Sequence, residues 1–109
     1  MNQKEIIKWI GLAKVTVLNE SNILNGDKLA YTNAVGLSKT KTEFRNEVKN
    51  KLYSMDLKLL RLESTEPFAE RLEKHKVDNE IIKIANRLSV KNLIEFSTFH
   101  TYPENKNPN

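Results

Sequence analysis

The chain has 109 residues, the usual size of one domain, so we expect a single domain over residues 1–103 and a disordered tail over 104–109. With 39% hydrophobic and 29% charged residues, the composition is typical of chains that fold. The chain contains no cysteine, which excludes disulfides, thiolate zinc sites and cysteine nucleophiles. Lys8 and Lys14 interrupt the apolar N-terminal stretch, and no apolar run reaches the ~20 residues of a membrane span. We therefore expect a small soluble, cytoplasmic protein with no membrane partner.

The net charge of +4 is unevenly distributed along the chain. Residues 31–60 carry six basic and three acidic groups, whereas residues 61–109 carry eight of each. A basic excess suits an anionic partner such as nucleic acid, although compositional drift towards lysine and asparagine explains it equally well.

The first third of the chain predicts two strands joined by a turn. Residues 4–10 fit a short helix or the lead-in to a strand, and the alternating apolar residues of 13–18 predict a strand. The pair Asn25-Gly26 tolerates positive φ and marks a hairpin turn. In the second strand, 29–38, one face carries only small residues, so a helix can approach that face closely: Ala30, Thr32, Ala34 and Gly36.

A helix and a third strand follow. Thr40 and Glu43 have the spacing of a capping box, and the apolar stripe of the helix is Phe44, Val48, Leu52 and Met55. The leucine-rich segment 57–63 predicts a strand that is covered on both faces or lies at the end of a sheet.

The stretch 64–89 is helical in pattern but not one straight helix. At about 100° per residue, Phe68 and Leu72 would lie opposite Ile81, Ala85 and Leu88. We therefore predict a break near residues 75–78, with one helix starting at about Pro67 and another at Asp78. Residues 92–102 predict the fourth strand, which Pro103 ends.

The order β-β-α-β-α-β predicts an α+β domain, with a four-stranded sheet and helices packed mainly on one face. The side chains expected to form its buried layer are Phe44, Val48, Leu52, Ile81 and Leu88.

Known catalytic and cofactor motifs are missing from the sequence. The glycines Gly11, Gly26 and Gly36 begin no phosphate-binding loop, and neither HExxH, GxSxG nor an EF-hand pattern occurs. The two histidines, His75 and His100, lie 25 positions apart and form no local metal pair. We expect no cofactor and no metal, and a non-enzymatic role is favoured.

Two groups of residues are candidate sites. Strict alternation places Thr98, His100 and Tyr102 in one row, which could bind a small anion or transfer a proton because imidazole titrates near neutrality. Phe96 and Phe99 have opposite parity, which predicts either a bulge in this strand or cover on both faces. An ordinary histidine at a sheet margin is the competing interpretation of His100.

The second candidate lies on the first helix, where Arg45, Lys49 and Tyr53 follow one another at i, i+4 and i+8, with Lys41 preceding them. Such a row could contact phosphates and stack one base, although Glu43 and Glu47 lie one strip away and a solvated helix face fits as well.

These observations predict a small noncatalytic protein-binding module. In size and α+β style it resembles the small bacterial immunity-type proteins that neutralise toxins, or a regulatory protein, although a charge of +4 disfavours a nuclease-neutralising subtype. The alternative is a nucleic-acid-binding α+β domain that uses the basic helix row. Exposed aromatic residues on the sheet would favour it, although the sequence lacks the aromatic RNP pattern of RNA-binding domains of this class. A third hypothesis is an enzyme centred on His100 and Tyr102. A free sheet edge would also allow a homodimer.

Overall fold

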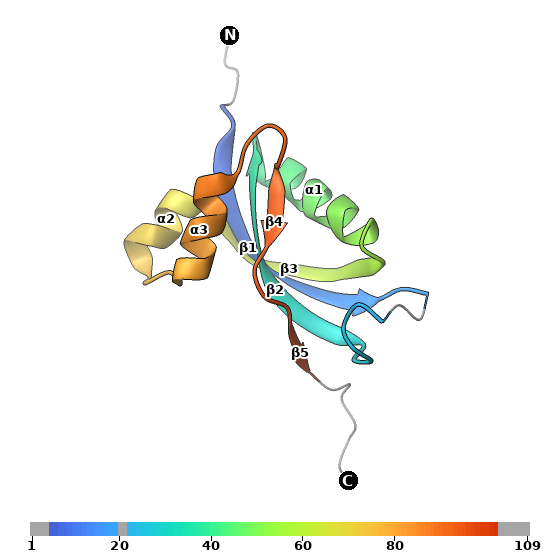
Figure 1. Cartoon of the computed structure of the whole chain (residues 1–109). Coiled ribbons are helices and arrows are strands. Elements are labelled where there is room, and N and C mark those ends of the chain that lie inside the picture. Colours follow the sequence, from blue (N-terminus) through green and yellow to red (C-terminus); the bar gives the residue numbers. More distant parts are fainter. Residues whose placement is uncertain (1–4, 20–21, 103–109) are drawn as a thin grey trace.

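A computed structural model describes residues 5–19 and 22–102. Within these ranges, five strands form one antiparallel sheet and three helices pack against it (Figure 1). The elements in chain order are β1 (Ile7–Val17), β2 (Leu29–Ser38), α1 (Lys41–Tyr53), β3 (Leu57–Pro67), α2 (Phe68–Lys74), α3 (Asn79–Arg87), β4 (Ile94–Phe96) and β5 (His100–Tyr102). The predicted α+β class is confirmed, and the predicted order β-β-α-β-α-β fits roughly, because the last α and the last β are each present as two elements.

The sheet has the strand order β3-β1-β2-β4, and β5 pairs with β2 beyond the end of β4. The β1–β2 ladder runs without a shift from Ile7 opposite Ser38 to Thr16 opposite Leu29. In the connection between these strands, Asn25 and Gly26 both have positive φ, as the turn prediction requires. The edge strand β3 is irregular, because its register against β1 shifts twice.

The helix α1 covers the face that carries the small residues of β2. Thr40 caps the helix by accepting the Glu43 N–H at 3.1 Å, and Phe44, Val48 and Leu52 are fully buried as predicted. They pack against Ala13 and Val15 of β1 and against Ala30 and Ala34 of β2, and together these residues form the main core. The close approach expected from the small row of β2 is therefore present.

A second core lies on the opposite face of the sheet. Its buried residues are Ile10, Val35, Phe68, Ile81, Ile84 and Ala85. The predicted break is confirmed, since α2 ends at Lys74 and α3 begins at Asn79. The break lets Phe68 of α2 and Ile81 of α3 both pack against the sheet, which one straight helix could not do. Leu72 of α2 stays exposed.

The helices therefore cover both faces, which differs from the expectation that they pack mainly on one. Ile10 and Val35 are directly paired and have opposite parity to Ala13 and Ala34, so they point away from α1. Figure 1 shows α1 on one side of the strands and α2 with α3 on the other. Of the five side chains expected in one layer, Ile81 and Leu88 belong to the second core.

The predicted fourth strand is split into β4 and β5 by a bulge. Phe96 is opposite Ala34, whereas His100 is opposite Tyr31, so the later strand contains one extra residue. Ser97 is buried inside the bulge, where its Oγ accepts the Asn33 N–H at 3.1 Å. The extra residue brings Phe96 and Phe99 to the same core, with their rings 5.7 Å apart. The expected tail at 104–109 lies outside the described residues.

Candidate functional site on the open sheet face

One sheet face is covered by helices only at one end. The helices α2 and α3 pack over Ile10 and Val35, and the remainder of this face carries half-buried or exposed side chains. We call this remainder the open face. By register and parity, its residues are Leu12, Lys14 and Thr16 of β1, Leu29, Tyr31 and Asn33 of β2, Lys58, Arg61 and Glu63 of β3, and His100 and Tyr102 of β5.

A cross-strand row of basic and aromatic residues runs through the middle of the open face. Arg61, Lys14, Tyr31 and His100 are direct partners in successive strand pairs, so their side chains are neighbours on one surface. The row changes from cationic on β3 and β1 to aromatic on β2 and β5. A ligand with both anionic groups and flat rings would match this order.

Three rings form an aromatic platform on the open face. The Tyr31 ring lies 5.6 Å from the His100 ring and 6.0 Å from the Tyr102 ring, with angles of 32° and 37° between the planes. Tyr31 is 40% exposed and His100 is also exposed. Rings at these separations and moderate angles offer stacking surface to a flat ligand.

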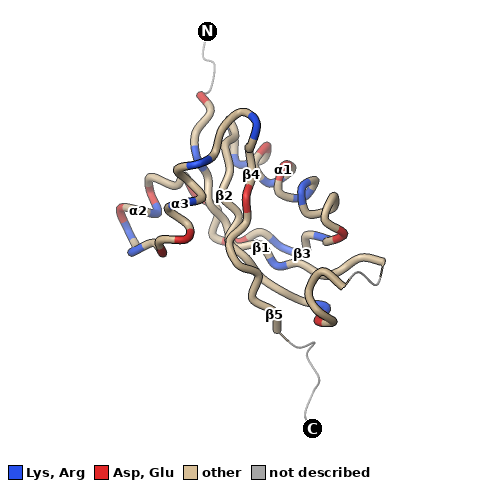
Figure 2. The backbone as a smooth tube through the Cα atoms, in the orientation of Figure 1, with Lys and Arg blue, Asp and Glu red and all other residues tan. Residues whose placement is uncertain are grey.

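The cations beside this platform are partly neutralised. The Glu63 carboxylate lies 2.9 Å from Arg61 Nε and 3.8 Å from Lys14 Nζ. Lys58 belongs to the neighbouring row, opposite Thr16. Figure 2 shows basic positions of β1 and β3 in adjacent parts of the sheet. Three cations and one carboxylate therefore leave this part of the open face with a formal charge of +2.

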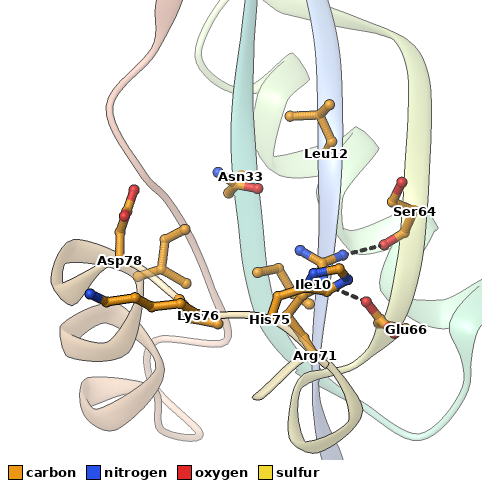
Figure 3. A pocket seen from close by; sticks show the side chains of 11 residues that line it. Ile10, Leu12, Asn33, Ser64, Glu66, Arg71, His75, Lys76 and Asp78 are labelled. Carbon is orange, nitrogen blue, oxygen red and sulfur yellow. Dashed lines mark hydrogen bonds and ion pairs between the residues drawn. The ribbon is translucent and has the colours of Figure 1, made fainter. Parts of the chain in front are cut away.

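A cleft of about 450 Å³ opens beside the open face, between the sheet and the segment that joins α2 to α3 (Figure 3). Leu12 and Asn33 line the cleft and also belong to the open face. The remaining lining residues are Ile10, Ser64, Glu66, Arg71, His75, Lys76, Val77, Asp78 and Ile81. The cleft and the platform are thus parts of one continuous surface.

An ion pair fixes one wall of this cleft. Arg71 Nε donates to the Glu66 carboxylate, and Arg71 Nη2 donates to the Ser64 carbonyl oxygen at 2.7 Å. The hydrogen bond from Arg71, helped by Lys74 at 3.3 Å, lowers the pKa of Glu66 below its ordinary value, although desolvation acts in the opposite direction. Arg71 therefore serves to join α2 to the irregular part of β3.

The predicted row of Thr98, His100 and Tyr102 assumed strict alternation, but the bulge between β4 and β5 interrupts that alternation. The anion-binding or proton-transfer role expected of the row stays a prediction. Thr98 donates from its N–H and its hydroxyl to Glu80 of α3, at 2.9 and 2.8 Å. His100 and Tyr102 do share a face, but their neighbour is Tyr31. Sequence reasoning placed Tyr31 on the correct face of its strand but did not select it as a site residue. Only the pairing of β2 with β5 brings Tyr31 beside His100 and Tyr102, and the sequence alone does not reveal this pairing.

The basic helix row is present as a separate surface. Arg45, Lys49 and Tyr53 line a small hollow of about 170 Å³ beside the start of β3, and Tyr53 is 71% exposed. Lys41 is exposed at the beginning of α1 and does not line this hollow. The Glu43 carboxylate is hydrogen-bonded at the start of the helix, where it accepts the Lys39 N–H at 3.1 Å.

Comparison with known proteins found no relative of this chain. No protein-family model matches the chain, and no curated protein or solved structure is detectably similar to it. Across residues 5–19 and 22–102, no three histidine, aspartate or glutamate side chains come together as a metal-ligand set. In the same ranges, no helix combines the length and the apolar character needed to cross a bilayer.

Proposed function

We propose that this chain is a binding module that holds single-stranded nucleic acid on its open face. The observation that carries the proposal is the platform of Tyr31, His100 and Tyr102 next to Lys14 and Arg61. Bases stack on exposed aromatic rings whatever their sequence, and lysine or arginine beside the rings contacts the phosphates. Exposed aromatic residues on the sheet are the feature that was expected to favour this function over a protein-binding role.

Single strands fit this surface better than a duplex does. In a duplex the bases are stacked on each other and their flat faces are not accessible to a protein platform. Stacking contributes about 1 to 3 kcal/mol per base in proteins of this kind, so two or three rings are enough for measurable affinity. We place this activity in the cytoplasm, which the lack of cysteine suits.

The direct test is the binding of a labelled RNA of about 12 nucleotides, followed by fluorescence anisotropy. If Lys14, Lys58 and Arg61 each contact one phosphate, raising the salt from about 50 to 200 mM weakens binding roughly 20-fold. A duplex of the same sequence should bind more weakly than the single strand. Failure of the single strand to bind at the lower salt concentration would rule the function out.

Two matched tyrosine variants then locate the surface. Tyr31→Ala removes the central ring of the platform and should raise the Kd for the RNA about fivefold or more. Tyr53→Ala removes an exposed ring from the basic row of α1 and should leave the Kd unchanged. The reverse pattern would move the site to Arg45, Lys49 and Tyr53, the surface first expected from the sequence. Thermal unfolding of both variants checks that the fold is retained.

A protein-binding module of immunity-type or regulatory function is the second candidate, and one surface favours it. An apolar hollow of about 300 Å³ is lined by Ile7, Lys8, Pro67, Phe68, Ala69 and Leu72. Ile7 and Leu72 remain exposed there, at 37% and 48%. Exposed apolar residues that adjoin each other are typical of protein contacts.

This candidate has its own test, in which the native host's extract is passed over the wild-type chain and over Leu72→Glu. A protein retained by the wild type and lost with Leu72→Glu would identify a partner of the apolar hollow. The charged side chain should prevent docking, whereas the open face, built on other residues, keeps its affinity for RNA. A protein retained equally by both chains would argue against this hollow as the docking surface.

A further inference from the structure

The cleft beside the aromatic platform differs from the open face in its chemistry. Its lining includes two basic residues, Arg71 and Lys76, and two acidic residues, Glu66 and Asp78, so the formal charges cancel. Arg71 is already held by Glu66 and by the Ser64 carbonyl. A phosphate would gain little attraction in such a cleft, whereas an uncharged group would meet no repulsion.

Apolar side chains contribute part of the lining. Ile10 and Ile81 are buried in the second core, and Leu12 and Val77 are half-buried beside them. The volume of about 450 Å³ falls in the range of small-molecule sites, about 300 to 1,000 Å³. An uncharged, partly apolar group of moderate size is the occupant that this lining suits.

Asn33 supplies polar groups at the place where the cleft meets the platform. Its backbone is fixed, because its N–H donates to Ser97 Oγ at 3.1 Å and its carbonyl accepts the Ser97 N–H at 2.9 Å. Within the part of the chain that the structure describes, its side-chain amide has no hydrogen-bond partner. Asn33 is two residues from Tyr31 on the same face of β2, and Figure 3 shows it at the wall of the cleft.

We propose that the cleft receives one nucleobase of the strand that lies on the open face, and that the Asn33 amide reads its edge. The amide presents an N–H donor and a carbonyl acceptor side by side, which is the arrangement that forms a bidentate pair with a base. The apolar residues of the cleft lie against the ring of this base. This inference rests on the proposed function and adds base selectivity to it, since stacking on the platform alone is tolerant of sequence.

The test compares labelled A8, C8 and U8 RNA at one salt concentration. For the wild-type chain, the Kd for the best homopolymer should be lower than that for the worst by about tenfold or more. Asn33→Leu keeps the approximate size of the side chain and removes both polar groups, so the preference should fall to about twofold. Asn46→Leu, at an exposed position of α1, is the matched control and should keep the full preference.

Asn33→Asp provides a second variant in case the leucine lowers stability. It keeps the shape but replaces the donor with an acceptor, so the order of the three homopolymers should change. Equal binding of all three RNAs by the wild type, or a preference that survives both Asn33 variants, would overturn the base-reading role while leaving the proposed function intact. No binding of any RNA would instead overturn the proposed function itself.

Discussion

At Gly36 of β2, the helix α1 and the chain around β4 lie too close to the strand to leave room for a side chain. A Cβ atom placed there would lie 2.9 Å from the Leu93 carbonyl oxygen and 3.1 Å from Phe44 Cε1, and it would also collide with the Ile94 side chain. The position is buried in β2, between β4 and α1. One missing methyl group therefore permits α1 and the chain around β4 to approach the same strand.

Gly36→Ala should therefore lower the free energy of unfolding, by about 1 to 3 kcal/mol, because the backbone of residue 93 cannot move aside without disturbing the strand. Gly11→Ala is the matched control. The nearest atoms to its Cβ would be side-chain atoms, Thr65 Oγ1 at 2.9 Å and Leu62 Cδ1 at 3.0 Å, which shift more easily than a backbone carbonyl does. Urea unfolding of both variants measures the difference. An equal or greater loss for Gly11→Ala would contradict the proposed role of Gly36.

At the scale of elements, local periodicity predicted the helices well. The capping pair Thr40 and Glu43 marked the start of α1, and its buried stripe followed from spacing alone. The angular mismatch of Phe68 with Ile81 was enough to predict the break between α2 and α3. These features depend on residues within a few turns of one another, so the sequence contains all the information they require.

The sheet's end was harder to predict, because the bulge between β4 and β5 depends on a partner about 65 residues away. Opposite parity of Phe96 and Phe99 indicated that a bulge was one solution. Its location is set by Ser97, whose carbonyl accepts the Thr32 hydroxyl at 2.8 Å. That contact joins two segments that are distant in sequence. The strict alternation assumed for Thr98, His100 and Tyr102 therefore does not hold along this segment, and Tyr31, the ring beside His100 and Tyr102, was not selected as a site residue.

At the scale of the whole molecule, the side of the sheet on which each helix packs determines where the open face lies. Strand residues of both parities are apolar near Ile10 and Val35, so both faces can be covered there. Further along β1 and β2, the side chains facing away from α1 become Lys14 and Tyr31, and helix cover ends. The open face thus results from a change in the pattern of the strands. Its composition could be derived from the sequence once the helices were assigned to opposite faces.

The second core is tied to the edge of the sheet by one ion pair, which makes the stability of the molecule sensitive to acid. Arg87 at the end of α3 donates to both oxygens of Glu95 in β4, from Nε at 2.8 and 2.9 Å and from Nη2 at 2.6 Å. Hydrogen bonding from Arg87, and to a smaller extent from Asn92, lowers the pKa of Glu95 below its ordinary value of 4.5, against the effect of desolvation.

Because the folded-state pKa of Glu95 is below its unfolded value, the stabilisation is complete above about pH 4.5 and is lost as the pH falls through the folded-state pKa. Glu95→Gln removes this titration. We expect the variant to melt at a lower temperature than the wild type at pH 7, and the difference to shrink as the pH is lowered towards 3. Circular dichroism melts at several pH values measure it, with Glu73→Gln, at an exposed position of α2, as the control. A difference in melting temperature that stays constant across this range would mean that Glu95 acts by packing and not by its charge.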